Sequence, residues 1–138
     1  MPANAQPIFS KIGDIQWGAA AITAANTAKD GTGTVTTIFT ADITNGGLVD
    51  DIVIAPIGTN VQTVLRVFIN NGSTNATPAN NVLIDEVVLP ATTLTETDLM
   101  GIFRCSINRA LPPGYKINVV LATAIAAGVM VSANGGKY

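Results

Sequence analysis

Few side chains in this chain can do chemistry, and they do not gather into a familiar site. Carboxylates are adjacent at Asp50-Asp51 and at Asp85-Glu86, and Glu96 lies two residues before Asp98. Paired carboxylates can act as acid and base or hold Ca²⁺ through their oxygens. Adjacent residues on a strand point to opposite faces, so only Glu96 and Asp98 would project together. We expect these groups to be solvated strand ends, and a hydrolase using Glu96 and Asp98 is the weakest of three functional hypotheses.

Other motifs offer no stronger catalytic or binding pattern. The chain has no His, the side chain used most often as a general base and transition-metal ligand. Cys105 is the sole cysteine, and its strand-like neighbourhood predicts core packing rather than a reactive thiol. Asp30-Gly31-Thr32-Gly33 resembles a phosphate cradle but lacks its lysine and its strand-to-helix context, so a turn is expected. We predict no catalytic, cofactor-binding or metal-binding residues and therefore a protein that is not an enzyme.

The composition limits the partners. Only 12% of the 138 residues are charged, whereas Thr contributes 17 residues, Asn 12 and Gly 13. A net charge of -2 with scattered lysines and arginines argues against nucleic acid as a partner. The uncharged stretch 117–131 is shorter than the roughly 20 residues that span a bilayer, so we expect two strands around a turn and no membrane partner. Residues 1–7 show no signal-peptide pattern, which predicts synthesis in the cytoplasm.

Periodicity places these residues in an all-β protein. Runs of alternating and β-branched residues are separated by Gly, Asn, Asp or Pro, and no long segment has a helical period. Strands are expected near 14–25, 34–41, 51–55, 60–69, 82–89, 101–110, 115–121 and 128–133. About eight short strands with connections of mixed length predict an antiparallel two-sheet sandwich of jelly-roll or Greek-key type. The strand order stays open at this stage.

Three segments lie outside this strand pattern. Residues 1–11 are proline-rich and predict an extended N-terminal arm, which leaves 12–138 as a single sandwich domain. Residues 70–81 carry no charge and predict an exposed loop. Most aromatic rings, Trp17 included, are expected in the core. Tyr138 is the exception, because it follows Gly135-Gly136, and it is expected to dock on a surface of its own chain or of a partner.

These features together resemble the head decoration, or cement, proteins of tailed bacteriophages, which are small jelly-roll-like virion proteins. The resemblance rests on the arm from Pro2 to Pro7, on residues 28–33 before a Thr-rich strand, and on residues 111–115 leading to the terminal Gly135-Gly136-Lys137-Tyr138. It implies a non-enzymatic protein that binds major capsid proteins on the outer capsid surface, stabilises the head by bridging them, and forms a homotrimer. It carries over no catalytic residues and no cofactor.

A capsid-binding role predicts contacts in the arm, in the uncharged loop and at the C-terminus. The expected contact residues are Pro2, Gln6, Pro7, Ile8, Phe9, Asn71, Ser73, Asn75 and Tyr138. Low charge favours this role because an uncharged surface costs little to desolvate. The alternative is a phage tail or receptor-binding module that recognises a host surface glycan through its loops. The single tryptophan weakens this alternative, because sugar-binding sandwiches usually present more aromatic rings.

Overall fold

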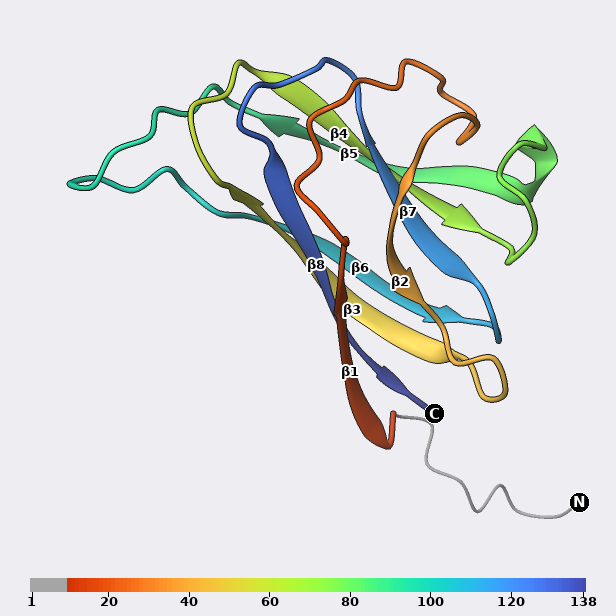
Figure 1. Cartoon of the computed structure of the whole chain (residues 1–138). Coiled ribbons are helices and arrows are strands. Elements are labelled where there is room, and N and C mark those ends of the chain that lie inside the picture. The colour runs from red at the N-terminus through yellow and green to blue at the C-terminus, as the bar shows by residue number, and fades with distance from the viewer. Residues whose placement is uncertain (1–9) are drawn as a thin grey trace, which may run out of the picture.

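The computed structural model describes residues 10–138, which form eight strands and one turn of 3-10 helix (Figure 1). The strands are β1 (Ile12–Trp17), β2 (Thr36–Thr40), β3 (Gly47–Pro56), β4 (Thr63–Asn70), β5 (Asn81–Leu89), β6 (Phe103–Leu111), β7 (Lys116–Leu121) and β8 (Val129–Lys137). The 3-10 turn, η1 (Pro78–Asn80), lies between β4 and β5. No helix within this described part is long and apolar enough to cross a membrane.

The strands form two antiparallel four-stranded sheets that pack face to face. One sheet has the order β1-β8-β3-β6 and the other the order β2-β7-β4-β5. Strand pairs that are distant in sequence therefore lie side by side, which is the jelly-roll arrangement. The predicted all-β sandwich is confirmed, and the strand order selects the jelly roll among the Greek-key topologies that the sequence allowed.

The core fills the space between the two sheets. Inward-facing residues of β3 and β8 meet those of β4 and β7, as the two-residue period of each strand requires. The largest fully buried side chains of the described residues are Phe39, Phe68, Ile38, Ile52, Ile54, Leu65, Ile117, Leu121, Val49, Val67, Val119 and Val131. All of these except Phe68 belong to the cluster between the sheets.

The first and last strands differ from their predicted bounds. β1 ends at Trp17, whereas a strand over 14–25 was expected, because the small residues after Gly18 offer little side-chain packing. Beyond it, Ile22 and Ala25 each form only a single bridge. β8 continues to Lys137 through two glycines that were expected to follow the strand. A Cβ atom at Gly135 would collide with the Leu48 carbonyl oxygen, so glycine is what allows this strand to pass.

β4 alternates between the core and the outer side of its sheet along its whole length. Thr63, Leu65 and Val67 are buried facing the core, and Ile69 packs against it. The register shift between Val67 and Phe68 comes from an extra residue on β5, Ile84, because the register of β4 with β7 is continuous. Phe68 is fully buried on the outer side of its sheet. The β4–β5 connection is also shorter than predicted, because Asn70 and Asn81 pair within the ladder.

Polar side chains close both open sides of the sandwich. Gln16 of β1 donates from Nε2 to the Thr40 carbonyl of β2, and the Thr40 N–H donates to Gln16 Oε1, both at 2.9 Å. On the opposite side, the Cys105 thiol of β6 donates to Asp85 Oδ2 of β5 at 2.7 Å. The edge strands of the two sheets are therefore tied to each other.

Candidate interaction surfaces

The Asn-rich loop between β4 and β5 is ordered by its own amides. Asn71 donates two hydrogen bonds to Asn80, from its backbone N–H to the Asn80 carbonyl at 3.0 Å and from its side-chain Nδ2 to Asn80 Oδ1 at 3.2 Å. The Ser73 N–H donates to Asn71 Oδ1 at 3.1 Å. Asn71 and Ser73 are exposed as predicted, whereas Asn75 is half-buried. The loop therefore presents a fixed surface whose amides are largely occupied within the protein.

Asn75 connects this loop to the one that links β1 and β2. Its Nδ2 donates to the carbonyl oxygens of Gly31 and Gly33, at 3.1 and 2.8 Å. These glycines have φ of 80° and 83°, so the turn expected at residues 30–33 is confirmed. Within it, the Thr32 hydroxyl and then the Thr32 N–H donate to Asp30, which lowers the pKa of that carboxyl group. Asn75 has a structural role that the sequence did not indicate.

Asn60 holds together three loops at the opposite end of the sandwich. Its Oδ1 accepts the N–H groups of Ala127 and Gly128 at 2.9 Å, and its Nδ2 donates to the Gly128 carbonyl at 3.0 Å. Asn60 and Thr92 exchange backbone hydrogen bonds, and the Thr92 hydroxyl donates to the Gly58 carbonyl at 2.7 Å. Residues 57–62, 90–95 and 122–128 are thus fixed relative to one another. We call this end, together with residues 18–28, the loop end.

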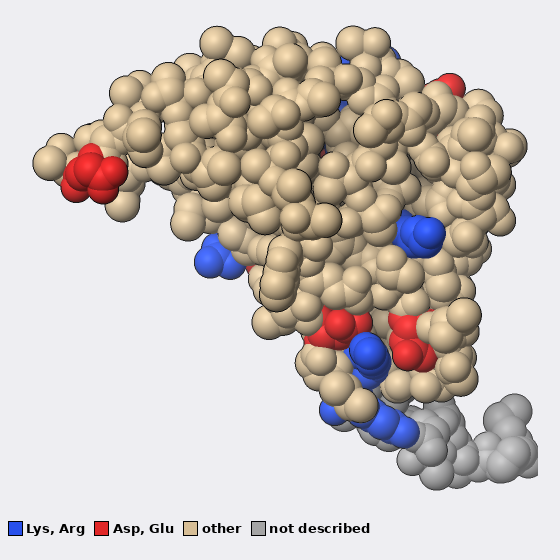
Figure 2. Space-filling model, viewed as in Figure 1, with Lys and Arg blue, Asp and Glu red and all other residues tan. Residues whose placement is uncertain are grey.

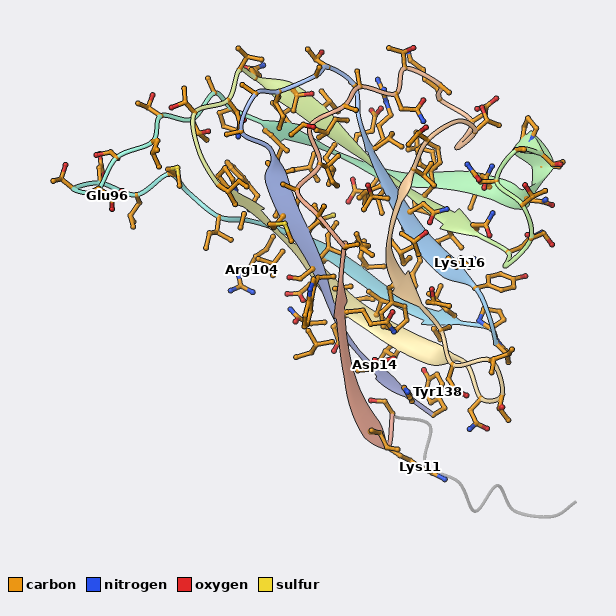
Figure 3. The ribbon with its side chains drawn as sticks, in the orientation of Figure 1. Lys11, Asp14, Glu96, Arg104, Lys116 and Tyr138 are labelled. Atoms are coloured by element: carbon orange, nitrogen blue, oxygen red, sulfur yellow. The ribbon has the colours of Figure 1, made fainter. Side chains whose placement is uncertain are left out.

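The loop end is uncharged and partly apolar. No charged residue occurs in 18–28, 57–62, 90–95 or 122–128. Ile57, Val61 and Leu94 are nevertheless exposed there, and Val61 retains 60% of its accessible surface. Figure 2 shows a broad area without charge, whereas charged side chains gather toward the opposite end and at the tip of the loop that carries Glu96 (Figure 3). We call residues 96–102 the projecting loop. In the sequence, this surface could have been found from single hydrophobic residues that stand among Thr, Ala and Gly.

A second apolar surface covers the outer face of the β1-β8-β3-β6 sheet. Ile15 and Trp17 point away from the core, because Gln16 between them pairs with the fully buried Ala133. Trp17 is 64% exposed, so its predicted place in the core is wrong. The chain bends away at Gly18 and leaves the ring at the strand's end. At the other edge of this sheet, Ile102 is 64% exposed just before β6.

The projecting loop adds to this second surface. Leu99 is 91% exposed, and a shallow groove lies between residues 98–102 and residues 55–56 of β3. We call the outer face of the β1-β8-β3-β6 sheet, with residues 99–102, the apolar face. Leu99 and Ile102 were not singled out from the sequence, although a leucine within a Thr-, Glu- and Asp-rich linker could have indicated exposure.

The carboxylates form no joint site. Asp51 accepts from Asn134 Nδ2 at 2.6 Å, and Glu86 pairs with Arg66 Nε at 2.8 Å. Glu96 lies near the tip of the projecting loop and is exposed, as is Asp98 (Figure 3). No group of three His, Cys, Asp or Glu side chains among residues 10–138 is placed to hold a metal ion.

Cys105 lies in the core, as the sequence predicted. It is 6% exposed and belongs to the cluster between the sheets. Burial raises the pKa of its thiol to about 12, and the hydrogen bond to Asp85 and the negative charge of Asp85 act in the same direction. The thiol is therefore kept protonated and unreactive.

Of the remaining predicted contact residues, Tyr138 is the one that lies within residues 10–138. Tyr138 follows β8 directly and is half-buried (Figure 3). The Lys11 N–H donates to the Lys137 carbonyl at 2.7 Å, so backbone pairing begins within the predicted arm. Pro2, Gln6, Pro7, Ile8 and Phe9 lie outside the described residues.

Comparison with known proteins gives one structural similarity. A chain of the cyanophage Pam1 capsid asymmetric unit aligns with 98% of this chain and with 91% of its own length. The sequence identity is 15% and the TM-score is 0.42. No protein-family model matches the chain, and no curated protein matches its sequence.

Proposed function

We propose that this chain is a non-enzymatic structural protein of a tailed-phage virion, which binds the outer capsid surface and stabilises the head by bridging major capsid proteins. The observation that carries the proposal is a jelly roll whose loop end is uncharged, apolar and locked by hydrogen bonds. Jelly rolls serve as viral structural domains and as lectins, so the surfaces must distinguish between such roles.

The loop end is suited to bind another protein. Burying a charged group costs desolvation free energy unless the group finds a partner of opposite charge. The uncharged loops with exposed Ile57, Val61 and Leu94 avoid this cost. The Asn60 hydrogen bonds fix these loops before any partner arrives, which reduces the entropy lost on binding.

Bridging requires two separate contacts, and the chain offers one at each end. The loop end would contact one capsid protein. The arm of residues 2–9, together with Asn71, Ser73 and Tyr138, would contact its neighbour. The strand connections place loop 71–80, the start of β1 and the end of β8 opposite the loop end. This arrangement supports a cement role more directly than the fold does.

Binding to phage heads tests the proposal. Heads stripped of accessory proteins are sedimented with the full chain, with a variant lacking residues 2–9, and with Val61→Asp. We expect saturable binding by the full chain, a reduction of at least tenfold for each variant, and a higher temperature of DNA release from coated heads. Val82→Asp is the matched control, because Val82 is similarly exposed on β5, outside both contacts. Absence of saturable binding by the full chain would refute the proposal.

Glycan recognition in a phage tail is the alternative. The amides of Asn71, Asn75 and Asn80, which such a module would use to bind hydroxyl groups, are engaged in bonds within the protein. A glycan array tests it directly. Specific glycan binding without head binding would favour a tail or receptor-binding module, and the homotrimer that the resemblance implies stays a prediction under either role.

A further inference from the structure

We propose that two copies of this chain pack face to face through the apolar face, related by a two-fold axis that runs along the strand direction. This contact goes beyond the proposed function, because it uses neither the loop end nor the arm. It competes with the homotrimer that the resemblance implies, because a two-fold contact closes with two copies. It rests on the residues that the strand order aligns across the sheet, on the few charges they include, and on their exposure.

The register places complementary side chains at the two ends of one row. Trp17 of β1 pairs with Ser132 of β8, Ser132 with Val53 of β3, and Val53 with Arg104 of β6. All four lie on the outer side of the sheet, so the row runs from an exposed indole at one edge to a guanidinium at the other. Arg104 projects from this face, and its side chain is 68% exposed (Figure 3).

A two-fold rotation along the strands joins these ends. It turns the second sheet over, so that β1 of one copy lies opposite β6 of the other. Trp17 of each copy then faces Arg104 of its partner, and the contact occurs twice. A guanidinium over an indole ring gains a cation–π attraction that strengthens as water is excluded. An isologous contact needs such a self-complementary pair.

The neighbouring positions extend this contact. Ala55 pairs with Met130 one step along the strands, and the groove beside Ala55 is formed by Leu99, Met100 and Ile102. The projecting loop of each copy would therefore cover the area next to Trp17 of its partner.

Charge and exposure both fit a second copy. The charged residues near the centre of the face, Asp51 and Arg104, lie 3.7 Å apart and offset each other. Ile15, Trp17, Leu99 and Ile102 are each more than 60% exposed, so this face offers apolar side chains that a second copy can cover. A contact centred on so few apolar side chains is small, and small interfaces dissociate readily, so we expect the dimer to form only at high concentration.

Sedimentation of the purified chain across a concentration series, combined with Trp17 fluorescence, tests this contact. We expect twice the mass of the 14.1 kDa chain at high concentration, with an emission shift to shorter wavelength as the single tryptophan becomes buried. Ile102→Ser should raise the dissociation constant at least tenfold and remove the concentration-dependent shift. Arg104→Ala should act in the same direction, whereas Val82→Ser on β5 should change neither readout.

Any of the following results would overturn the proposed contact. A monomer at all concentrations, a three-fold mass, or a dimer that forms without a change in Trp17 emission would each exclude it. So would a dimer that Ile102→Ser leaves intact. The assay contains no phage heads, so its failure would leave the capsid-binding proposal standing, and failed head binding would leave the dimer standing. If both hold, one dimer carries two copies of each capsid contact.

Discussion

Replacing Asp85 with asparagine tests how the lone thiol is kept protonated. Cys105 Sγ lies 2.7 Å from Asp85 Oδ2 in a site between β5 and β6. Burial of the thiol is the largest cause of its raised pKa, followed by its hydrogen bond to Asp85 and by the charge of that carboxylate. With asparagine at position 85, the Cys105 thiol stays buried and an amide oxygen can still accept the S–H hydrogen, whereas the negative charge of the carboxylate is removed.

The magnitude follows from the pKa, which rises from 9.0 to about 12. At about pH 8, a thiol of pKa 9 is roughly 10% ionised, whereas one of pKa 12 is about 0.01% ionised. Alkylation proceeds through the thiolate, so it should be about 1,000-fold slower than for an ordinary thiol. Asp85→Asn should recover part of this difference, on the order of tenfold, because the largest cause remains.

Iodoacetamide labelling followed by mass spectrometry measures the effect from about pH 7 to about pH 11. The rate for the wild-type protein should rise tenfold per pH unit over this whole range. Glu86→Gln is the control, because Glu86 carries the same charge on the next residue and pairs with Arg66. A wild-type rate that levels off near pH 9, or equal rates for Asp85→Asn and Glu86→Gln, would refute the reasoning.

The same pKa shift makes stability depend on pH. The thiol of the unfolded chain ionises near 9.0, and that of the folded chain near 12. Below pH 9 the thiol is protonated in both the folded and the unfolded state, so its contribution to the free energy of unfolding is fully present. Between pH 9 and pH 12 the unfolded state releases its proton first, so the free energy of unfolding should fall. Cys105→Ser should remove this part of the decrease in a series of urea denaturation curves.

Three further predictions concern stability. Asn60→Ala should lower the free energy of unfolding by about 2–4 kcal/mol in urea denaturation, because the buried groups of Gly128 lose their partners. Gly135→Ala should cost about 2–4 kcal/mol through its collision with β3, whereas Gly13→Ala, with open space around it, should change stability by less than about 0.5 kcal/mol. Asp42 accepts from the N–H groups of residues 45 and 44, which lowers its pKa, so carboxyl NMR should show it titrating below 3.8. The stability from these bonds is present above about pH 4 and lost as the pH falls through the lowered pKa.

Periodicity predicted the fold class because each buried strand alternates between core and surface. β4 shows both the strength and the limit of this signal. Leu65, Val67 and Ile69 share the core side, whereas the burial of Phe68 on the outer side of the sheet depends on other segments of the chain. A bulge at Ile84 of β5 shifts the register between β5 and β4, and no local pattern in β4 indicates it. Strand order is likewise a property of pairing between distant segments, so the sequence left it open.

The candidate surfaces were harder to predict than the strands. Trp17 was assigned to the core with the other aromatic rings, but its exposure depends on β1 lying at a sheet edge and ending at Trp17. Asn75 was predicted to contact a partner, and the structure adds a role that the sequence did not indicate, because Asn75 holds a loop 44 residues away in sequence. A side chain's type states what it can bind, whereas its partner within the chain is decided by tertiary structure.

The sheet edges indicate how this protein can associate with its neighbours. An open edge strand offers free N–H and C=O groups to another chain. At the β2 edge, Gln16 occupies both backbone groups of Thr40. On β5, Asp85 points inward to Cys105, and a strand that places a carboxylate toward the core resists extension by a further strand. Two of the four sheet edges are blocked in this way. Association through the outer face of a sheet and through loops is therefore favoured over strand addition, and the contacts proposed above use that face and those loops.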